Sequence, residues 1–131
     1  MMNRTAPDAD AFLAIALETA AAFPAPFADL ARDVIVQVAE FPPDDILDEM
    51  DTDPWGLTGL YDGVSIPEKQ SGVQAHGPDI VWLYRRAILD EWADRGNVRL
   101  RDLIAHVTVH EFAHHFGWSD EDIAAIDRWW E

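Results

Sequence analysis

Hydrophobic and polar residues along the chain predict helices that alternate with short strands. Apolar residues recur at helical spacing over 8–23, which predicts a helix that Pro24 ends. The β-branched run at 34–39 predicts a strand covered on both faces. The same two patterns predict further elements, namely helices at 27–33 and 44–50, a strand at 79–84 and a helix at 87–95.

The middle of the chain carries a strong turn signal. Asp62-Gly63 lies between two short apolar segments, 57–61 and 64–66, and this arrangement predicts a β-hairpin. Residues 67–78 are punctuated by glycine and proline, so they are expected to form an exposed loop.

The last third of the chain is predominantly helical in pattern. A long helix is predicted from residue 97 or 98 to Phe116, ended by Gly117. A final helix is predicted at 120–130, with Ser119 as its N-cap. The length of 131 residues suits a single domain over residues 1–131.

Composition and charge exclude several classes of function. The chain has 25 acidic and 9 basic residues and a net charge of −16, which argues against contacts with nucleic acid or an anionic membrane. It has no cysteine, so disulfides and thiolate zinc sites are excluded. The N-terminus lacks the pattern of a signal peptide, and no apolar run reaches the ~20 residues that span a bilayer. A cytoplasmic location is therefore expected.

Residues 110–120 read HEFAHHFGWSD and contain the chain's most specific chemical motif. On a helix, His110 and His114 lie one turn apart, about 6 Å along the axis and about 40° around it. Two imidazoles can therefore reach one metal ion. Glu111 lies beside them, where it can take a proton from water as a general base. The pattern indicates a zinc hydrolase site.

Gly117 and Asp120 extend the motif beyond the two histidines. A glycine in the left-handed conformation reverses the chain after a helix, and this turn can bring Asp120 back as a third zinc ligand. Three protein ligands leave a fourth position open, as a catalytic zinc requires. Asp120 can instead be a first-turn acid of the last helix, in which case Glu121 and Asp122 are the alternative third ligands.

Other polar side chains are weaker candidates. His106 lies one turn before His110 and could line a cleft, whereas His115 points about 100° away from His114 and is expected to pack or hydrogen-bond elsewhere. His76 lies in the predicted loop and carries no argument. The candidate donors to an oxyanion are Tyr61, Tyr84 and Arg85.

The motif H-E-x-x-H-x-x-G-x-x-D, from His110 to Asp120, resembles that of the zincin metallopeptidases. With the segments 59–67, 80–85 and 108–122, the chain is most similar to the small bacterial zincin-like, or minimal metallopeptidase-like, proteins. The resemblance implies a zincin-like α+β fold, with a small mixed sheet packed on the active-site helix. It implies one catalytic zinc ion and a peptide or protein substrate. Residues 79–84 would be the edge strand that pairs with the substrate.

The same resemblance assigns His110, His114 and Asp120 to zinc and Glu111 to catalysis. Metzincins also place a methionine beneath the metal, downstream of the motif. Here the methionines, Met1, Met2 and Met50, all precede the motif, and 11 residues follow Asp120. These departures leave two alternatives, a zincin-like metal-binding regulatory or peptide-binding module without efficient turnover, and a small acidic interaction protein with structural histidines. The sequence does not determine the oligomeric state.

Overall fold

Six helices and three strands make up the part of the chain that the computed structural model describes, which is residues 7–72, 77–118 and 121. The helices are α1 (Ala9–Ala21), α2 (Phe27–Ala31), α3 (Asp44–Met50), α4 (Ile66–Gln70), α5 (Arg85–Arg95) and α6 (Leu100–Phe116). The strands are β1 (Ile35–Ala39), β2 (Gly59–Asp62) and β3 (Ile80–Tyr84). The predicted helix at 120–130 lies outside the described residues, apart from Glu121. None of the described helices has the length and apolar character to cross a bilayer.

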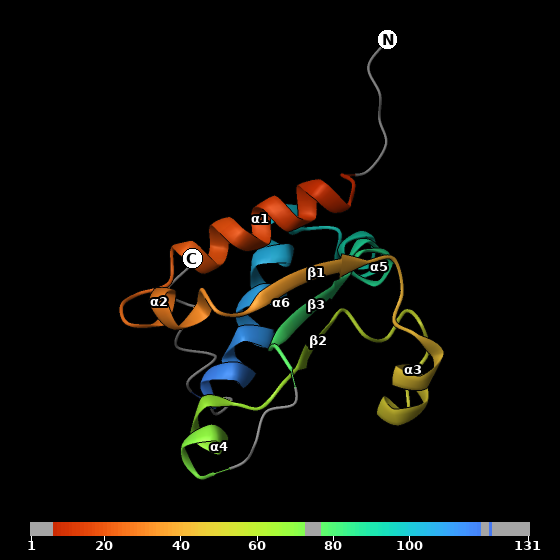
Figure 1. Cartoon of the computed structure of the whole chain (residues 1–131). Helices are drawn as coiled ribbons and strands as arrows, with labels where there is room; N and C mark the ends of the chain where they lie inside the picture. The colour runs from red at the N-terminus through yellow and green to blue at the C-terminus, as the bar shows by residue number, and fades with distance from the viewer. Residues whose placement is uncertain (1–6, 73–76, 119–120, 122–131) are drawn as a thin grey trace.

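The three strands form one mixed sheet in the order β1-β3-β2. β1 runs parallel to β3, with Ile35 opposite Ile80, and β2 runs antiparallel to β3, with Gly59 opposite Leu83. This arrangement confirms the predicted small mixed sheet and the α+β class. It corrects the expectation that residues 79–84 form the edge strand, because β3 lies at the centre. The edge strands of the described sheet are β1 and β2 (Figure 1).

The predicted hairpin at Asp62-Gly63 is wrong, because the chain enters a helix after the turn rather than a second strand. Ser65 is the N-cap of α4, its hydroxyl accepts a hydrogen bond from the Glu68 backbone N–H, and the Glu68 side chain closes a capping box. Hence residues 67–78 are not all loop, since α4 occupies the first of them. The partner of β2 is β3, which comes after α4 in the sequence.

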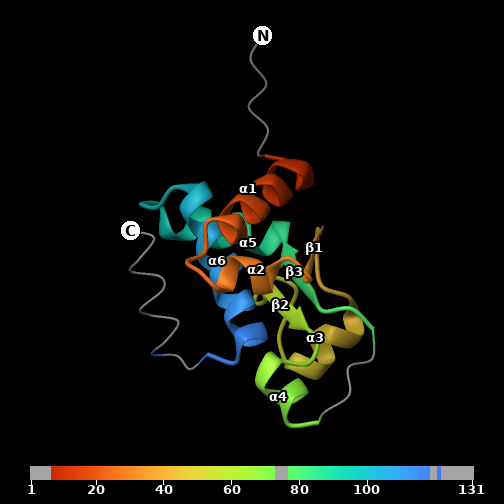
Figure 2. The ribbon, with the colours of Figure 1, turned by 60° about the vertical axis from the view of Figure 1, so that its left-hand side comes forward.

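Helices α1 and α6 cover one face of the sheet and form the core with it (Figures 1 and 2). Asp8 is the N-cap of α1, and its carboxylate accepts from Ala11 N at 2.9 Å. Alternate residues of β3, Val81 and Leu83, are fully buried against these helices. The other largest core side chains include Phe12, Ile88, Ile104, Val109 and Phe112.

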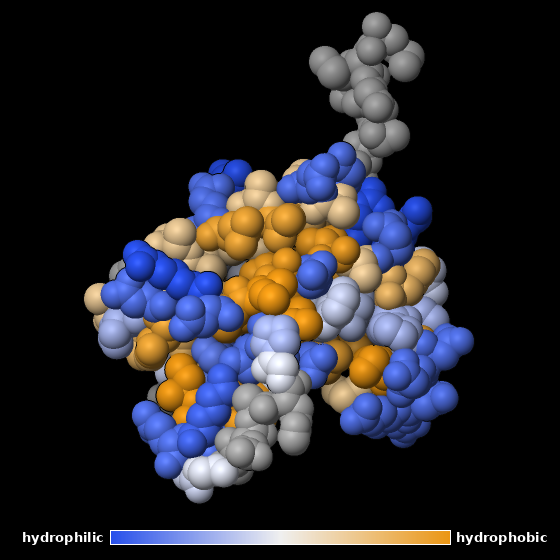
Figure 3. All heavy atoms as spheres, in the orientation of Figure 1, coloured by the Kyte–Doolittle hydropathy of each residue, from blue (hydrophilic) through white to orange (hydrophobic). Residues whose placement is uncertain are grey.

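The other face of the sheet is more open than the sequence suggested. Ile35 in β1 is 42% exposed, so the prediction of a strand covered on both faces is wrong. Apolar surface is visible around this strand and α1 in Figure 3, with hydrophilic residues at the margins. A β-branched run indicates an extended strand, but the number of covered faces depends on elements packed from elsewhere in the chain.

Candidate metal site on helix α6

Helix α6 ends in the chain reversal that the sequence predicted. Gly117 has a φ of 75°, Trp118 N donates to Ala113 O at 3.0 Å, and Gly117 N donates to His114 O at 3.2 Å. These two bonds form a Schellman motif, which satisfies the last carbonyls of the helix. An ideal Cβ at Gly117 would lie 2.6 Å from Cγ of Pro67, so α4 also packs closely against this turn. Gly117 is thus required both for its conformation and for the lack of a side chain.

His110 and His114 lie together on one side of α6, as their spacing predicted. Their ring centres are 5.6 Å apart and the ring planes are inclined at 79°. Two imidazoles on a tetrahedral zinc, each with Zn–N of about 2.0–2.1 Å, have ring centres about 5 Å apart. The observed separation therefore fits a shared ion. His110 is half-buried and His114 is exposed, which leaves the pair accessible from solvent.

The third predicted ligand, Asp120, lies outside the described residues, as does the alternative Asp122. Glu121 is described and is exposed. Within the described ranges, no group of three or more histidine and carboxylate side chains is arranged to hold a metal ion. The described residues therefore supply a two-histidine donor pair of the type that zinc accepts. The role of Asp120 stays a prediction.

Glu111 lies next to the histidine pair but is largely shielded from water, with 9% of its surface exposed. Burial raises the pKa of Glu111 to about 7, although a backbone hydrogen bond from Tyr61 acts in the opposite direction. The shielding comes from β2, because an ideal Cβ at Gly59 would lie 2.9 Å from Cγ of Glu111 and 2.9 Å from Cγ1 of Val107. Sequence analysis missed Gly59, although a glycine inside a strand signals close approach of another element.

The outer edge of β2 lies beside Glu111 and carries main-chain hydrogen-bonding groups. Tyr84 N donates to Thr58 O at 2.9 Å across the β2–β3 pair. In an antiparallel ladder these bonded positions alternate, so Leu60 also bonds to β3, whereas Gly59 and Tyr61 direct their N–H and C=O groups away from it. In the described sheet no strand lies beyond β2, so these groups line an edge.

The side of α6 about 100° away from His114 is packed against a partly buried polar cluster. His115 is 3% exposed, and its Nδ1 lies 2.9 Å from the hydroxyl of Tyr61 and 3.7 Å from a carboxylate oxygen of Asp79. Burial lowers the pKa of His115, and the carboxylate of Asp79 partly opposes this shift. The expectation that His115 hydrogen-bonds away from the metal pair is confirmed.

Two of the candidate oxyanion donors, Arg85 and Tyr84, are engaged in contacts within the fold. Arg85 donates from Nη1 to Glu40 Oε1 at 2.8 Å and from Nε to Pro7 O at 2.8 Å. Tyr84 is 1% exposed, and burial, reinforced by the charge of Asp62, raises its pKa to about 12. The third candidate, Tyr61, uses its hydroxyl in the buried cluster. An oxyanion role for any of them stays a prediction.

His106 continues the line of histidines toward the beginning of α6. Its ring centre lies 6.2 Å from that of His110, and the side chain is exposed. It lines a cavity of about 960 Å³ at the N-terminal end of the helix, together with Arg99 and Asp102. The residues that line this cavity do not include His110 or His114.

Comparison with known proteins agrees with this geometry. A family model described as zincin-like metallopeptidase matches residues 31–130, which include the sheet, helix α6 and the whole histidine motif. A search of curated proteins finds no match to the chain. Because the matched segment covers most of the sequence, the chain belongs to the zincin-like metallopeptidase family.

Proposed function

We propose that the protein is a zinc-dependent metallopeptidase that hydrolyses peptide or amide bonds in the cytoplasm. The observation that carries the proposal is the placement of two histidine rings 5.6 Å apart, directly beside a buried carboxylic acid on the same helix. Two neutral imidazoles and one adjacent carboxyl that does not need to bind the metal are the parts that zinc-dependent hydrolysis uses. Family membership supports the same conclusion.

His110 and His114 would hold the zinc ion, and Asp120 is the proposed third ligand. When bound, zinc supplies a Lewis acid that polarises a carbonyl group and acidifies water. His110 is half-buried and His114 is exposed, which supports a site at the boundary between core and solvent. A substrate can therefore approach from the side of α6 that is not packed.

Glu111 is proposed to take a proton from the attacking water and to pass it to the departing amine. A general base must be held within reach of the water that it deprotonates, and burial against β2 holds the Glu111 carboxyl beside the histidine pair. Its contact with Gly59 also restricts the directions in which the carboxyl can turn. Burial thus orients the proposed acid–base group.

The outer edge of β2 is the proposed docking site for the substrate backbone. Gly59 directs its N–H and C=O, and Tyr61 its C=O, to this edge, and an extended peptide can pair with such groups as an added strand, while Tyr61 N–H is bonded to Glu111. Because Gly59 also contacts Glu111, a peptide on this edge would pass close to the histidine pair. Recognition through the main chain suits a peptide or protein substrate whose sequence can vary.

The proposal can be tested with the full chain, a measurement of bound zinc and a fluorogenic peptide library. We expect zinc-dependent cleavage that a chelator removes and added zinc restores. Glu111→Gln should lower the cleavage rate by roughly 10²–10⁴-fold while zinc remains bound. His106→Ala, on the same helix but away from Glu111, is the matched control and should retain activity. Zinc binding without cleavage of any library member would reject the peptidase in favour of a metal-binding or peptide-binding module.

A further inference from the structure

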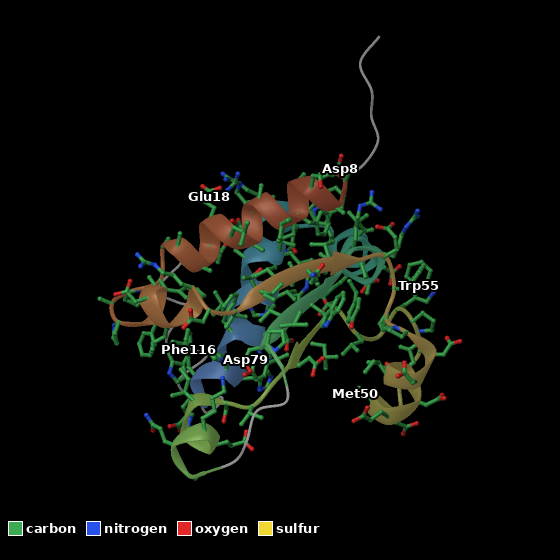
Figure 4. The ribbon with its side chains drawn as sticks, viewed as in Figure 1. Asp8, Glu18, Met50, Trp55, Asp79 and Phe116 are labelled. Carbon is green, nitrogen blue, oxygen red and sulfur yellow. The ribbon has the colours of Figure 1, made fainter. Side chains whose placement is uncertain are left out.

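A partly buried polar cluster joins four separate parts of the chain, with Asp79 and His115 buried, Tyr61 half-buried and Lys69 exposed. Its members are Tyr61 in β2, Lys69 in α4, Asp79 before β3 and His115 in α6. Asp79 is 6% exposed and forms an ion pair with Lys69. Figure 4 shows Asp79 beside the C-terminal part of α6. We call these four residues the Tyr61 cluster.

The hydroxyl of Tyr61 is the centre of this cluster. It lies 2.9 Å from His115 Nδ1, 3.1 Å from Asp79 Oδ1 and 3.1 Å from Val64 O. A hydroxyl has one proton to donate and two lone pairs to accept with. The ring of His115 also hydrogen-bonds to the backbone carbonyl of Leu30, which requires the proton on Nε2, so in the neutral ring Nδ1 accepts the hydroxyl proton of Tyr61. The Asp79 carboxylate accepts separately from Lys69 and from Val64 N, so it is satisfied as a buried polar group must be.

Gly63 makes room for this arrangement. An ideal Cβ at Gly63 would lie 2.8 Å from the Tyr61 hydroxyl and would also collide with the Asp79 carboxylate. The Asp62-Gly63 pair therefore allows a close approach of side chains, where the sequence suggested a hairpin turn. A phenylalanine ring at residue 61 could fill the same space without any of these bonds. The hydroxyl of Tyr61 is therefore needed for its hydrogen bonds and not for packing.

The cluster and Glu111 are connected through β2. Gly59 and Tyr61 are two positions apart in the strand and so lie on the same face, about 7 Å from each other. On α6, Glu111 and His115 are one turn apart and also face β2. Gly59 contacts Glu111 and Tyr61 bonds to His115, so the strand is held to the helix at two neighbouring points. The first point also includes a hydrogen bond from Tyr61 N–H to the Glu111 carboxyl, so the backbone and the hydroxyl of Tyr61 both bond to α6.

We propose that Tyr61 is a positioning residue, whose hydroxyl fastens β2 to α6 and thereby fixes the substrate-binding edge and the Glu111 carboxyl relative to each other. The backbone hydrogen bond from Tyr61 to Glu111 agrees with this role. The catalytic consequence rests on the proposed peptidase function. The mechanical link does not, because it can be measured in protein that is not turning over.

The test compares Tyr61→Phe with Thr108→Val in the full chain. Tyr61→Phe removes only the hydroxyl. Thr108→Val removes another buried hydroxyl, which donates to Ile104 O at 2.8 Å within α6 and is not part of the cluster. Amide hydrogen exchange is followed by NMR at Leu60 in β2. Zinc binding, kcat and KM are measured on the same samples.

Tyr61→Phe should speed exchange at Leu60 by roughly tenfold relative to Thr108→Val, the effect of losing one hydrogen bond. Zinc should stay bound, and kcat should fall by a similar factor with KM nearly unchanged. Equal exchange at Leu60 in the two variants would overturn the proposal. If the wild-type chain cleaves no peptide, the proposed function fails, and the exchange measurement still decides whether Tyr61 holds β2. If Tyr61→Phe does not fold, His115→Phe removes the other end of the same bond and gives the same comparison.

Discussion

His114 and His115 are neighbours in α6, yet their surroundings differ completely. His114 is exposed and lies 5.6 Å from the ring of His110, whereas His115 is 3% exposed and bonds to Tyr61. A rotation of about 100° along the helix separates the two positions. We call the side with His106, His110 and His114 the open side, and the side with His115 the packed side.

The comparison shows how neighbouring positions of one helix can face a candidate metal site on one side and a structural cluster on the other. On the packed side the ring nitrogen of His115 is used in a bond to Tyr61, and burial lowers the pKa of the ring. On the open side the rings of His110 and His114 face each other at a distance that suits a shared ion. Glu111 lies between the two sides and is buried by the packing of β2.

The strongest way to break the comparison is to remove single histidines. His110→Ala and His114→Ala should each weaken zinc binding by at least roughly a hundredfold, because each removes a ligand. His115→Gln should keep zinc affinity within about tenfold and instead lower stability by about 1 kcal/mol, because it disturbs a buried hydrogen bond. Competition with a chromogenic chelator and urea unfolding measure the two effects.

His106→Ala is the control on the open side. It should change neither the zinc affinity nor the free energy of unfolding appreciably, as is usual for substitutions of exposed residues. A loss of zinc affinity in His115→Gln equal to that in His114→Ala would remove the distinction between the sides.

A substitution at Gly59 tests how β2 shields Glu111, the residue between the open side and the packed side. The added methyl group of Gly59→Ala would meet Glu111 and Val107 at 2.9 Å and Trp82 O at 3.1 Å, so β2 must shift from α6. We expect a loss of about 2 kcal/mol in stability, typical of overpacking, together with reduced peptide cleavage.

Gly96→Ala provides the control for Gly59→Ala. Gly96 has a φ of 73° and no atom within 4 Å of its ideal Cβ, so the substitution strains the backbone without a new contact. It should lower stability by about 1 kcal/mol and leave cleavage unchanged. Thermal unfolding and cleavage rates separate the two variants, and full cleavage activity in Gly59→Ala would contradict the account.

The packed side should also show a distinct pH dependence. Burial alone would raise the pKa of Asp79, but hydrogen bonds from Lys69, Val64 N and Tyr61 lower it overall. A carboxyl with a lowered pKa in the folded state stabilises the fold above its unfolded pKa of about 3.9, and this contribution is lost as the pH falls through the folded value. Asp79→Asn should therefore cost about 2 kcal/mol at pH 7, and the difference should shrink below about pH 4.

Urea unfolding at several pH values measures this effect. Asp29→Asn is the control, because its ion pair with Arg32 is 3.4 Å long and both side chains are largely exposed. Its effect should stay below about 0.5 kcal/mol at every pH. If the loss of unfolding free energy in Asp79→Asn grew as the pH fell, it would contradict the lowered pKa of Asp79.

Local features of the site could be predicted from the sequence, because they depend on spacing within one helix. The periodicity of apolar residues indicated helix α6 and its buried face, the spacing of His110 and His114 placed them together, and Gly117 marked the end. The start of the helix was less certain, since it begins at Leu100 rather than at 97 or 98. These predictions needed no knowledge of the rest of the fold.

Features that join distant segments could not be predicted in the same way. Tyr61 and His115 are 54 residues apart, and nothing near either residue indicates the other. The Asp62-Gly63 pair suggested a local hairpin, but β2 pairs with β3, and the capping box of Ser65 and Glu68 favours a helix between them. The identity of the edge strand follows from this pairing, so the error about residues 79–84 had the same cause.

X-ray absorption spectroscopy of the zinc-loaded chain tests the central claim most directly, because it reports the ligands of the ion itself. The account predicts two imidazole nitrogens at about 2.0–2.1 Å from zinc, with one of them lost in His110→Ala and none lost in His115→Gln. A zinc spectrum without imidazole scattering, or one that is the same in His110→Ala as in the wild-type chain, would contradict it.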